Sequence, residues 1–177
     1  MATHKYFFAG FGGQGILMLG QIMAYAAMIE GKEVTFLPSY GPEMRGGTAN
    51  CTVIVSDGPI SCPIIDQATC LVAMNQPSLV KFESLVSPGG HIFLNTSLIE
   101  QDVARGDVIV HPIPATDLAR DIGEERAANI VMLGAIHKMV GGVKRESLEM
   151  ALKKVLPESK AHLLALNLTA LDAWKQK

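Results

Sequence analysis

The chain has 177 residues, of which 49% are hydrophobic, 18% charged and 6% aromatic. Soluble domains usually carry about 25% charged residues, so this chain is unusually apolar, and the composition excludes a disordered protein. The net charge of -2 excludes the basic surface that a binder of nucleic acids or of membrane surfaces needs. The length suits one domain with a sizeable core, and the apolar surplus predicts that a partner subunit covers part of the surface.

The segment 6–29 has no charged residue, and its Ala24-Tyr25-Ala26 triplet is similar to a signal-peptidase site. Export or a membrane span is nevertheless disfavoured, because Gln14, Gln21 and the glycines between 10 and 15 would interrupt a hydrophobic helix in its first half. We therefore expect a cytoplasmic protein that binds neither membranes nor nucleic acids.

Three cysteines, Cys51, Cys62 and Cys70, are too few and too widely spaced for a disulfide framework, a paired-cysteine zinc site or an iron-sulfur cluster. The five histidines lack the spacing of metal ligands, and no set of serine, histidine and aspartate indicates a catalytic triad. We expect Cys51 and Cys70 to be small core residues within apolar strands. The chain is expected to hold no metal and to depend on other chains for catalysis.

The first part of the chain alternates between strands and a helix. Four consecutive elements are predicted: a strand at 4–9, a glycine turn at 10–15, a helix at 16–30 that Gly31 caps, and a strand at 33–37. This βαβ order favours a parallel sheet with a right-handed crossover. The β-branched segment 48–56 closes at the Asp57-Gly58 turn and is expected to add antiparallel strands.

The rest of the chain continues this pattern and ends in helices. A central strand is expected at 70–74, followed by a helix that starts near Pro77 and ends at 88–90. The further predicted elements are strands at 91–95 and 108–113, then helices at 124–140, 145–156 and 159–177. The sequence therefore predicts a single α/β domain over 1–177, with three α/β/α layers, a Rossmann-like, mostly parallel sheet and C-terminal helices.

The glycine turn is the first candidate binding element. Gly10, Gly12, Gly13, Gln14 and Gly15 form a GxGxxG pattern between a strand and a helix, where backbone N–H groups can approach phosphate oxygens at the positive end of the helix. The alternative is that the glycines only allow close packing of the helix on the strand.

A nicotinamide site is disfavoured by the residues that follow. Such a site needs an acidic residue at the carboxyl end of the second strand to bind the ribose hydroxyls. That place is taken by Leu37-Pro38-Ser39, and Glu33 stands at the other end of the strand. The glycine turn is therefore a candidate for another phosphate-bearing cofactor.

The connection from 38 to 47 is longer than the roughly two to six residues usual in α/β units, which suggests a function. It leaves the second strand at the edge of the sheet that carries the glycine turn. Arg45 is its best anion ligand; the other candidate binding residues here are Ser39, Tyr40, Glu43, Gly46 and Gly47. The alternative is an exposed loop with an ion pair between Glu43 and Arg45.

Asn75 and Gln76 follow the predicted central strand at a second strand-to-helix junction. Asn75 is expected to cap the helix that Pro77 begins, and Gln76 can reach a ligand at the same edge of the sheet.

Three motifs resemble a known family: GFGGQGI at 10–16, PSYGPEMRGGTANC at 38–51 and AMNQPSL at 73–79. With NIVMLGA at 129–135 and the helix at 147–157, they make nearly the whole chain similar to the gamma subunit of 2-oxoacid:ferredoxin oxidoreductases. The resemblance implies a heteromeric enzyme that oxidatively decarboxylates a 2-oxoacid, transfers the acyl group to coenzyme A and passes electrons to ferredoxin.

The resemblance also implies a division of labour, in which thiamine diphosphate, Mg²⁺ and iron-sulfur clusters belong to alpha, beta and delta-type subunits. The gamma subunit would shape the active site and contribute to binding coenzyme A, with Gly12 to Gly15 and Arg45 directed at its phosphates. The 38–51 motif favours 2-oxoglutarate as the substrate, while pyruvate and branched-chain 2-oxoacids stay open.

Two other functions stay open on the sequence alone. One is a stand-alone dinucleotide-binding oxidoreductase, which would bind a nicotinamide or flavin cofactor by itself. The other is a non-catalytic scaffold, in which the 40–47 loop would have no effect on the turnover of the enzyme. In isolation, the chain is expected to be inactive, and a homodimer of the isolated chain stays open.

Overall fold

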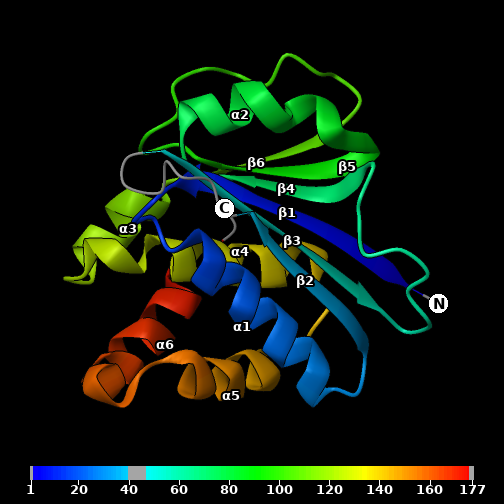
Figure 1. Ribbon diagram of the computed structural model, residues 1–177. Helices are drawn as coiled ribbons and strands as arrows, with labels where there is room; N and C mark the ends of the chain where they lie inside the picture. The colour runs from blue at the N-terminus through cyan, green and yellow to red at the C-terminus, as the bar shows by residue number, and fades with distance from the viewer. Residues whose placement is uncertain (1, 40–46, 176–177) are drawn as a thin grey trace.

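The computed structural model describes residues 2–39 and 47–175, which build one six-stranded sheet with helices on both faces (Figure 1). The strands lie in the order β2-β3-β1-β4-β5-β6. Their bounds are β1 (Thr3–Phe11), β2 (Glu33–Ser39), β3 (Thr48–Ser56), β4 (Ala68–Ala73), β5 (Val86–Asn95) and β6 (Ile109–Ile113). All six strands lie within a few residues of the segments that the sequence predicts.

Strand β3 is the exception in an otherwise parallel sheet. It pairs antiparallel with both β1 and β2, while β1, β4, β5 and β6 pair in parallel. Cys51 of β3 lies between Phe8 of β1 and Pro38 of β2. The expectation of a mostly parallel α/β sheet with an antiparallel addition is confirmed, and β1 and β2 share a direction without being neighbours.

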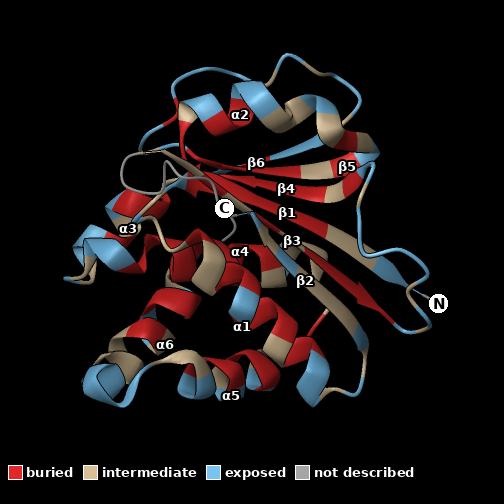
Figure 2. Ribbon diagram, in the orientation of Figure 1, coloured by how far each residue is buried: buried red, intermediate tan, exposed pale blue. Residues whose placement is uncertain are grey.

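Helices cover the two faces of the sheet unequally (Figure 1). The α-helices are α1 (Ile16–Ile29), α2 (Gln76–Phe82), α3 (Ala115–Asp121), α4 (Ala128–Val140), α5 (Arg145–Val155) and α6 (Leu164–Ala173). Helix α2 packs on β1 and β4 from one side, and α1 and α4 pack from the other, with α5 against α1 and α6 against α4. The larger hydrophobic core therefore lies between the sheet and α1 and α4 (Figure 2).

Two of the predicted helices have wrong boundaries here. Residues 88–90 do not end a helix: α2 ends at Phe82, a 3-10 turn follows at Glu83–Leu85, and Pro88, Gly89 and Gly90 lie within β5. Gly89 adopts a φ of 76°, and the pairing of β4 with β5 shifts register nearby, so these residues form an irregularity at the start of a strand. The helix predicted at 159–177 begins as a 3-10 segment, and α6 starts only at Leu164.

Helix α3 was not predicted, because its seven residues mix polar and apolar side chains too briefly for a periodic pattern. It follows Pro114 and buries Ala115, Thr116 and Ala119. The helix predicted from residue 124 likewise starts with a 3-10 turn, Glu125–Ala127, before α4.

Glycines allow two helices to approach their neighbours closely. A Cβ atom on Gly20 of α1 would lie 2.6 Å from Cys51 Sγ and 2.9 Å from Phe36 Cε2, so α1 lies directly on β2 and β3. Cys51 and Cys70 are fully buried, which confirms that they are core residues. Within the described part of the chain, no helix is long and apolar enough to cross a membrane.

We expect Gly134→Ala to destabilise the protein, although alanine is the better helix former. The added methyl group would overlap the Leu171 carbonyl oxygen on α6, and this backbone atom cannot move without shifting the helix. The propensity gain of about 1 kcal/mol is therefore outweighed, with a net loss of about 1–3 kcal/mol in the free energy of unfolding, measured by urea denaturation.

The matched control is Gly106→Ala, because a Cβ atom at Gly106 would meet no atom of residues 2–39 and 47–175 within 4 Å. It should change the stability by less than about 0.5 kcal/mol. A Gly134→Ala protein as stable as the wild type would contradict the close packing of α4 on α6.

Candidate functional site

The glycine segment 10–15 begins within the last two residues of β1 and leads into α1, at the carboxyl edge of the parallel strands. Gly10 and Gly15 serve packing: a Cβ atom on Gly10 would lie 2.6 Å from Gln14 Oε1, and one on Gly15, which has a φ of 71°, would lie 2.8 Å from Asn129 Cγ. Gly13 is different, because its φ is 94° and no atom of the described residues lies within 4 Å of where its Cβ would be. The structure therefore supports packing for two of these glycines and leaves Gly13 open to a ligand.

The Gln14 side chain is held by three hydrogen bonds. Its Oε1 accepts one from the Phe11 N–H at 2.7 Å and one from Asn75 Nδ2 at 3.0 Å, and its Nε2 donates one to the Met74 carbonyl at 3.2 Å. Because Gln14 follows β1 while Met74 and Asn75 follow β4, this one amide ties the ends of two neighbouring strands together. Its role in the described structure is to shape the turn.

Asn75 caps α2 as expected: its Oδ1 accepts a hydrogen bond from the Ser78 N–H at 3.0 Å. Gln76 instead pairs with Gln101, donating from Nε2 at 3.0 Å and accepting from the Gln101 N–H at 3.1 Å. This pair anchors the long connection between β5 and β6 to the start of α2. A ligand contact from Gln76 stays a prediction.

Three further polar residues at this edge were missed by the sequence analysis. Asn95, at the end of β5, is fully buried; its Nδ2 donates to Thr116 Oγ1 at 2.9 Å, and its Oδ1 accepts from the Thr116 N–H at 3.3 Å. Asn129 Nδ2 donates to the Gly15 carbonyl at 3.1 Å. The available signal was an asparagine directly at the end of an apolar strand, a pattern that Asn75 and Asn95 share.

The 38–47 connection has both of its described ends beside the glycine turn. Ser39 ends β2 opposite Asn50, and the Gly47 carbonyl accepts a hydrogen bond from the Gly12 N–H at 3.1 Å. The predicted binding residues Tyr40, Glu43, Arg45 and Gly46 lie outside the described residues. Their roles stay predictions, while the expected position of the connection at this edge agrees with its two ends.

A cleft of about 390 Å³ opens beside Gly13 and Gln14. Its other lining residues are Met74, Leu98, Thr116, Glu124, Glu125, Arg126 and Ala128. Arg126 is an exposed cation, and its backbone N–H donates to Glu124 Oε1 at 3.1 Å. The N-termini of α1 and α4 meet nearby, where Asn129 joins Gly15, and both helix dipoles favour an anion there. Arg126 is thus a cation at this edge that the sequence analysis missed.

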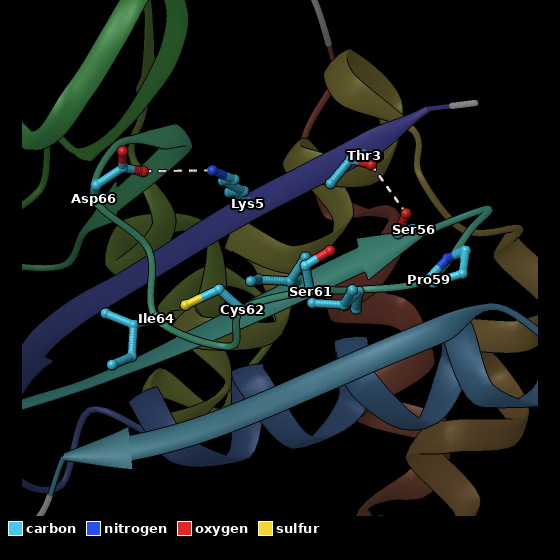
Figure 3. Close-up of a pocket in the computed structure, with 10 residues that line it drawn as sticks. Thr3, Lys5, Ser56, Pro59, Ser61, Cys62, Ile64 and Asp66 are labelled. Carbon is cyan, nitrogen blue, oxygen red and sulfur yellow. Dashed lines mark hydrogen bonds and ion pairs between the residues drawn. The ribbon is translucent and has the colours of Figure 1, made fainter.

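A separate hollow of about 590 Å³ lies near the opposite end of β1, under the connection from β3 to β4 (Figure 3). Lys5 Nζ and Asp66 Oδ1 form an ion pair at 3.4 Å along one side, and the Thr3 and Ser56 hydroxyls lie 2.9 Å apart on the other. The exposed Cys62 lies on this connection. Within residues 2–39 and 47–175, no three His, Cys, Asp or Glu side chains are grouped to hold a metal ion.

The described part of the chain is an α/β domain with a cleft and two helix N-termini at the carboxyl edge of its sheet. The profile of the pyruvate ferredoxin/flavodoxin oxidoreductase family matches residues 5–175. The chain therefore belongs to this family, and the resemblance that the sequence motifs indicate is confirmed.

Two relatives are a ketoisovalerate oxidoreductase subunit, VorA of Methanothermobacter thermautotrophicus, and a 2-oxoglutarate synthase subunit, KorC of Methanocaldococcus jannaschii. The chain is 40% identical to VorA over 166 residues, which cover 93% of the chain and 34% of VorA. It is 37% identical to KorC over 153 residues, which cover 85% of the chain and 82% of KorC. The chain thus spans about a third of one relative and most of the other.

Two solved structures share the fold. The gamma subunit of a keto/oxoacid ferredoxin oxidoreductase from Geobacter sulfurreducens has a TM-score of 0.81 at 31% identity, covering 96% of this chain and 97% of that one. A 2-oxoglutarate:ferredoxin oxidoreductase from Magnetococcus marinus, with 2-oxoglutarate, coenzyme A and succinyl-CoA bound, has a TM-score of 0.88 at 25% identity, covering 97% of this chain and 30% of that one.

Replacing Gln14 by alanine should destabilise the protein by about 1–3 kcal/mol, because the partly buried Met74 carbonyl and the exposed Phe11 N–H each lose a partner. Urea denaturation measures the change, and Gln67→Ala, at an exposed glutamine, is the control. Equal stabilities of the two variants would show that Gln14 does not hold this edge.

The three thiols should react in two classes with a thiol reagent at pH 8. Burial raises the pKa of Cys51 to about 12 and also raises the pKa of Cys70, so both stay protonated and inaccessible. Cys62 is exposed, so we expect one fast thiol in the native protein and three after unfolding. A second fast thiol in the native state would contradict the buried positions of Cys51 and Cys70.

Proposed function

We propose that the chain is the gamma subunit of a heteromeric 2-oxoacid:ferredoxin oxidoreductase. In this reaction a 2-oxoacid loses carbon dioxide, its acyl group is transferred to the sulfur of coenzyme A, and the released electron pair passes to ferredoxin. The observation that carries the proposal is the match to the Geobacter gamma subunit over 96% of this chain. We further propose that residues 1–177 act as one domain, in the cytoplasm.

The other cofactors are assigned to partner subunits of alpha, beta and delta type. Thiamine diphosphate with Mg²⁺ supplies the chemistry that removes carbon dioxide, and iron-sulfur clusters carry the electrons. The cysteines of this chain do not fit a cluster, because Cys51 and Cys70 are buried in β3 and β4 while Cys62 lies on the surface.

Coenzyme A is the ligand proposed for the carboxyl edge, where it supplies the thiol that accepts the acyl group. Gly13 leaves room for a phosphate group, Arg126 adds a positive charge, and the connection that carries Arg45 starts and ends beside the turn. Gln14, Asn75 and Asn129 keep this surface in place through their hydrogen bonds. The chain's own contribution is therefore to bind and orient an anionic ligand.

The proposed substrate is 2-oxoglutarate, supported by the similarity to KorC and to the Magnetococcus enzyme. A branched-chain 2-oxoacid is the second candidate, because the identity to VorA is 40%. Assays of the purified complex with both acids, pyruvate, coenzyme A and an electron acceptor test the choice. Equal rates with all three acids would contradict a preference for 2-oxoglutarate.

The topology counts against a stand-alone dinucleotide-binding enzyme. In a nicotinamide site the strand that carries the ribose-binding acid lies next to β1. Here the antiparallel β3 occupies that place, and β2 ends in Ser39 one strand further out. The end of β2 therefore lacks the ribose-binding acidic residue, and β2 is not the strand next to β1.

We expect Arg126→Ala and Arg45→Ala each to raise the KM for coenzyme A about ten- to hundredfold in the assembled complex, with little change in folding. Each substitution removes an arginine side chain whose positive charge, in our proposal, attracts an anionic group of coenzyme A at the carboxyl edge. Lys153→Ala, at an exposed lysine that pairs with Glu149 on α5, is the control. Wild-type kinetics in both arginine variants, with assembly checked by sizing, would exclude coenzyme A from this edge.

A further inference from the structure

Helix α1 carries no charge along its 14 residues, although one side of it faces away from the protein. Leu17, Gln21, Tyr25 and Met28 recur at helical spacing on that side, where Gln21 and Met28 are exposed and the other two are half-buried. Met28 is 59% exposed. A surface helix normally places charged residues on its outer face. The uncharged outer face of α1 is therefore suited to burial against another protein surface.

The outer face of α1 adjoins β2, which is an edge strand of the sheet. Between them lies a groove of about 330 Å³, lined by Gln21, Ala24, Tyr25, Met28, Val34 and Phe36. We call these six residues the α1–β2 groove. It contains no charged residue, which excludes a nucleic acid or an acidic peptide as its ligand.

Two lysines close to the groove make contacts within the chain. Lys32 Nζ lies 3.7 Å from Glu30 Oε2 and 3.8 Å from Asp57 Oδ1, and Lys154 Nζ lies 5.3 Å from the ring centre of Tyr25. Lys154 thus places a charge beside the apolar groove, and a polar rim around an apolar centre is the usual anatomy of a protein–protein interface.

We propose that the α1–β2 groove is the surface on which the larger subunit of the complex docks, inserting apolar side chains between α1 and β2; this inference rests on the proposed function. The larger subunit is favoured over a second copy because the region equivalent to this chain makes up only 34% and 36% of two relatives, where it shares one polypeptide with a larger neighbour.

Position gives the second reason. Helix α1 starts at Gly15 of the glycine turn, and β2 ends at Ser39, where the 38–47 connection leaves the sheet. Both walls of the groove therefore lead directly into the candidate site. A subunit seated in the groove is held beside the carboxyl edge, where its cofactor and the coenzyme A bound by this chain have to meet.

The test is Met28→Glu in a tagged chain expressed in its native host, with the copurifying thiamine-binding subunit quantified. A carboxylate in the groove should reduce the recovered subunit at least about tenfold, while Met28→Leu should retain it. The matched control is Ile64→Glu, an exposed apolar residue on the β3 to β4 connection, which should leave recovery unchanged. Circular dichroism and thermal unfolding of each isolated chain check the fold.

Equal recovery with Met28→Glu and Ile64→Glu would overturn the proposal. The proposal would also be overturned if Met28→Glu converted a dimer of the isolated chain into a monomer and left the recovery of the larger subunit unchanged. The groove would then be an interface between two copies of this chain. A wild-type chain that recovers no thiamine-binding subunit would instead refute the proposed function, so the two failures are distinguishable.

Discussion

The side-chain amide of Gln14 is the contact on which the candidate site depends. Its three hydrogen bonds join the end of β1 to the end of β4 and to Asn75, the cap of α2. This amide therefore ties the turn to the end of β4 directly before α1 begins. A neutral amide does this without a charge that would repel an anionic ligand or require its own counter-ion.

The insertion of β3 between β1 and β2 has two consequences that reach beyond the sheet. It brings the start of β3 next to the glycine turn, as the hydrogen bond between Gly12 and Gly47 shows. The insertion also places β2 at the edge of the sheet, where one side of β2 pairs with no further described strand. Helix α1 lies next to this edge strand. The position of β3 between β1 and β2 therefore determines which residues lie beside the glycine turn, and it also produces the groove that we propose for docking.

The distribution of charge fits a subunit that cooperates with others. The described carboxyl edge is lined mainly by amides and glycines, with Arg126 and the carboxylates of Glu124 and Glu125 at the rim of its cleft. Amides, exposed backbone N–H groups and a cation are groups suited to binding and positioning a ligand. The reacting groups in the proposed enzyme then come from coenzyme A and from the cofactors of the other subunits.

The sequence by itself determined where the strands and most helices lie along the chain, because apolar runs, glycines and prolines act over a few neighbouring residues. It also determined the family, through the motifs at 10–16, 38–51 and 73–79. It did not reveal how Gln14 and Asn75 meet across 61 positions, or how Asn129 reaches Gly15 across 114. Only the tertiary structure decided these contacts, together with the place of β3 and the cleft of Arg126, because each depends on residues that are distant in the chain and adjacent only after folding.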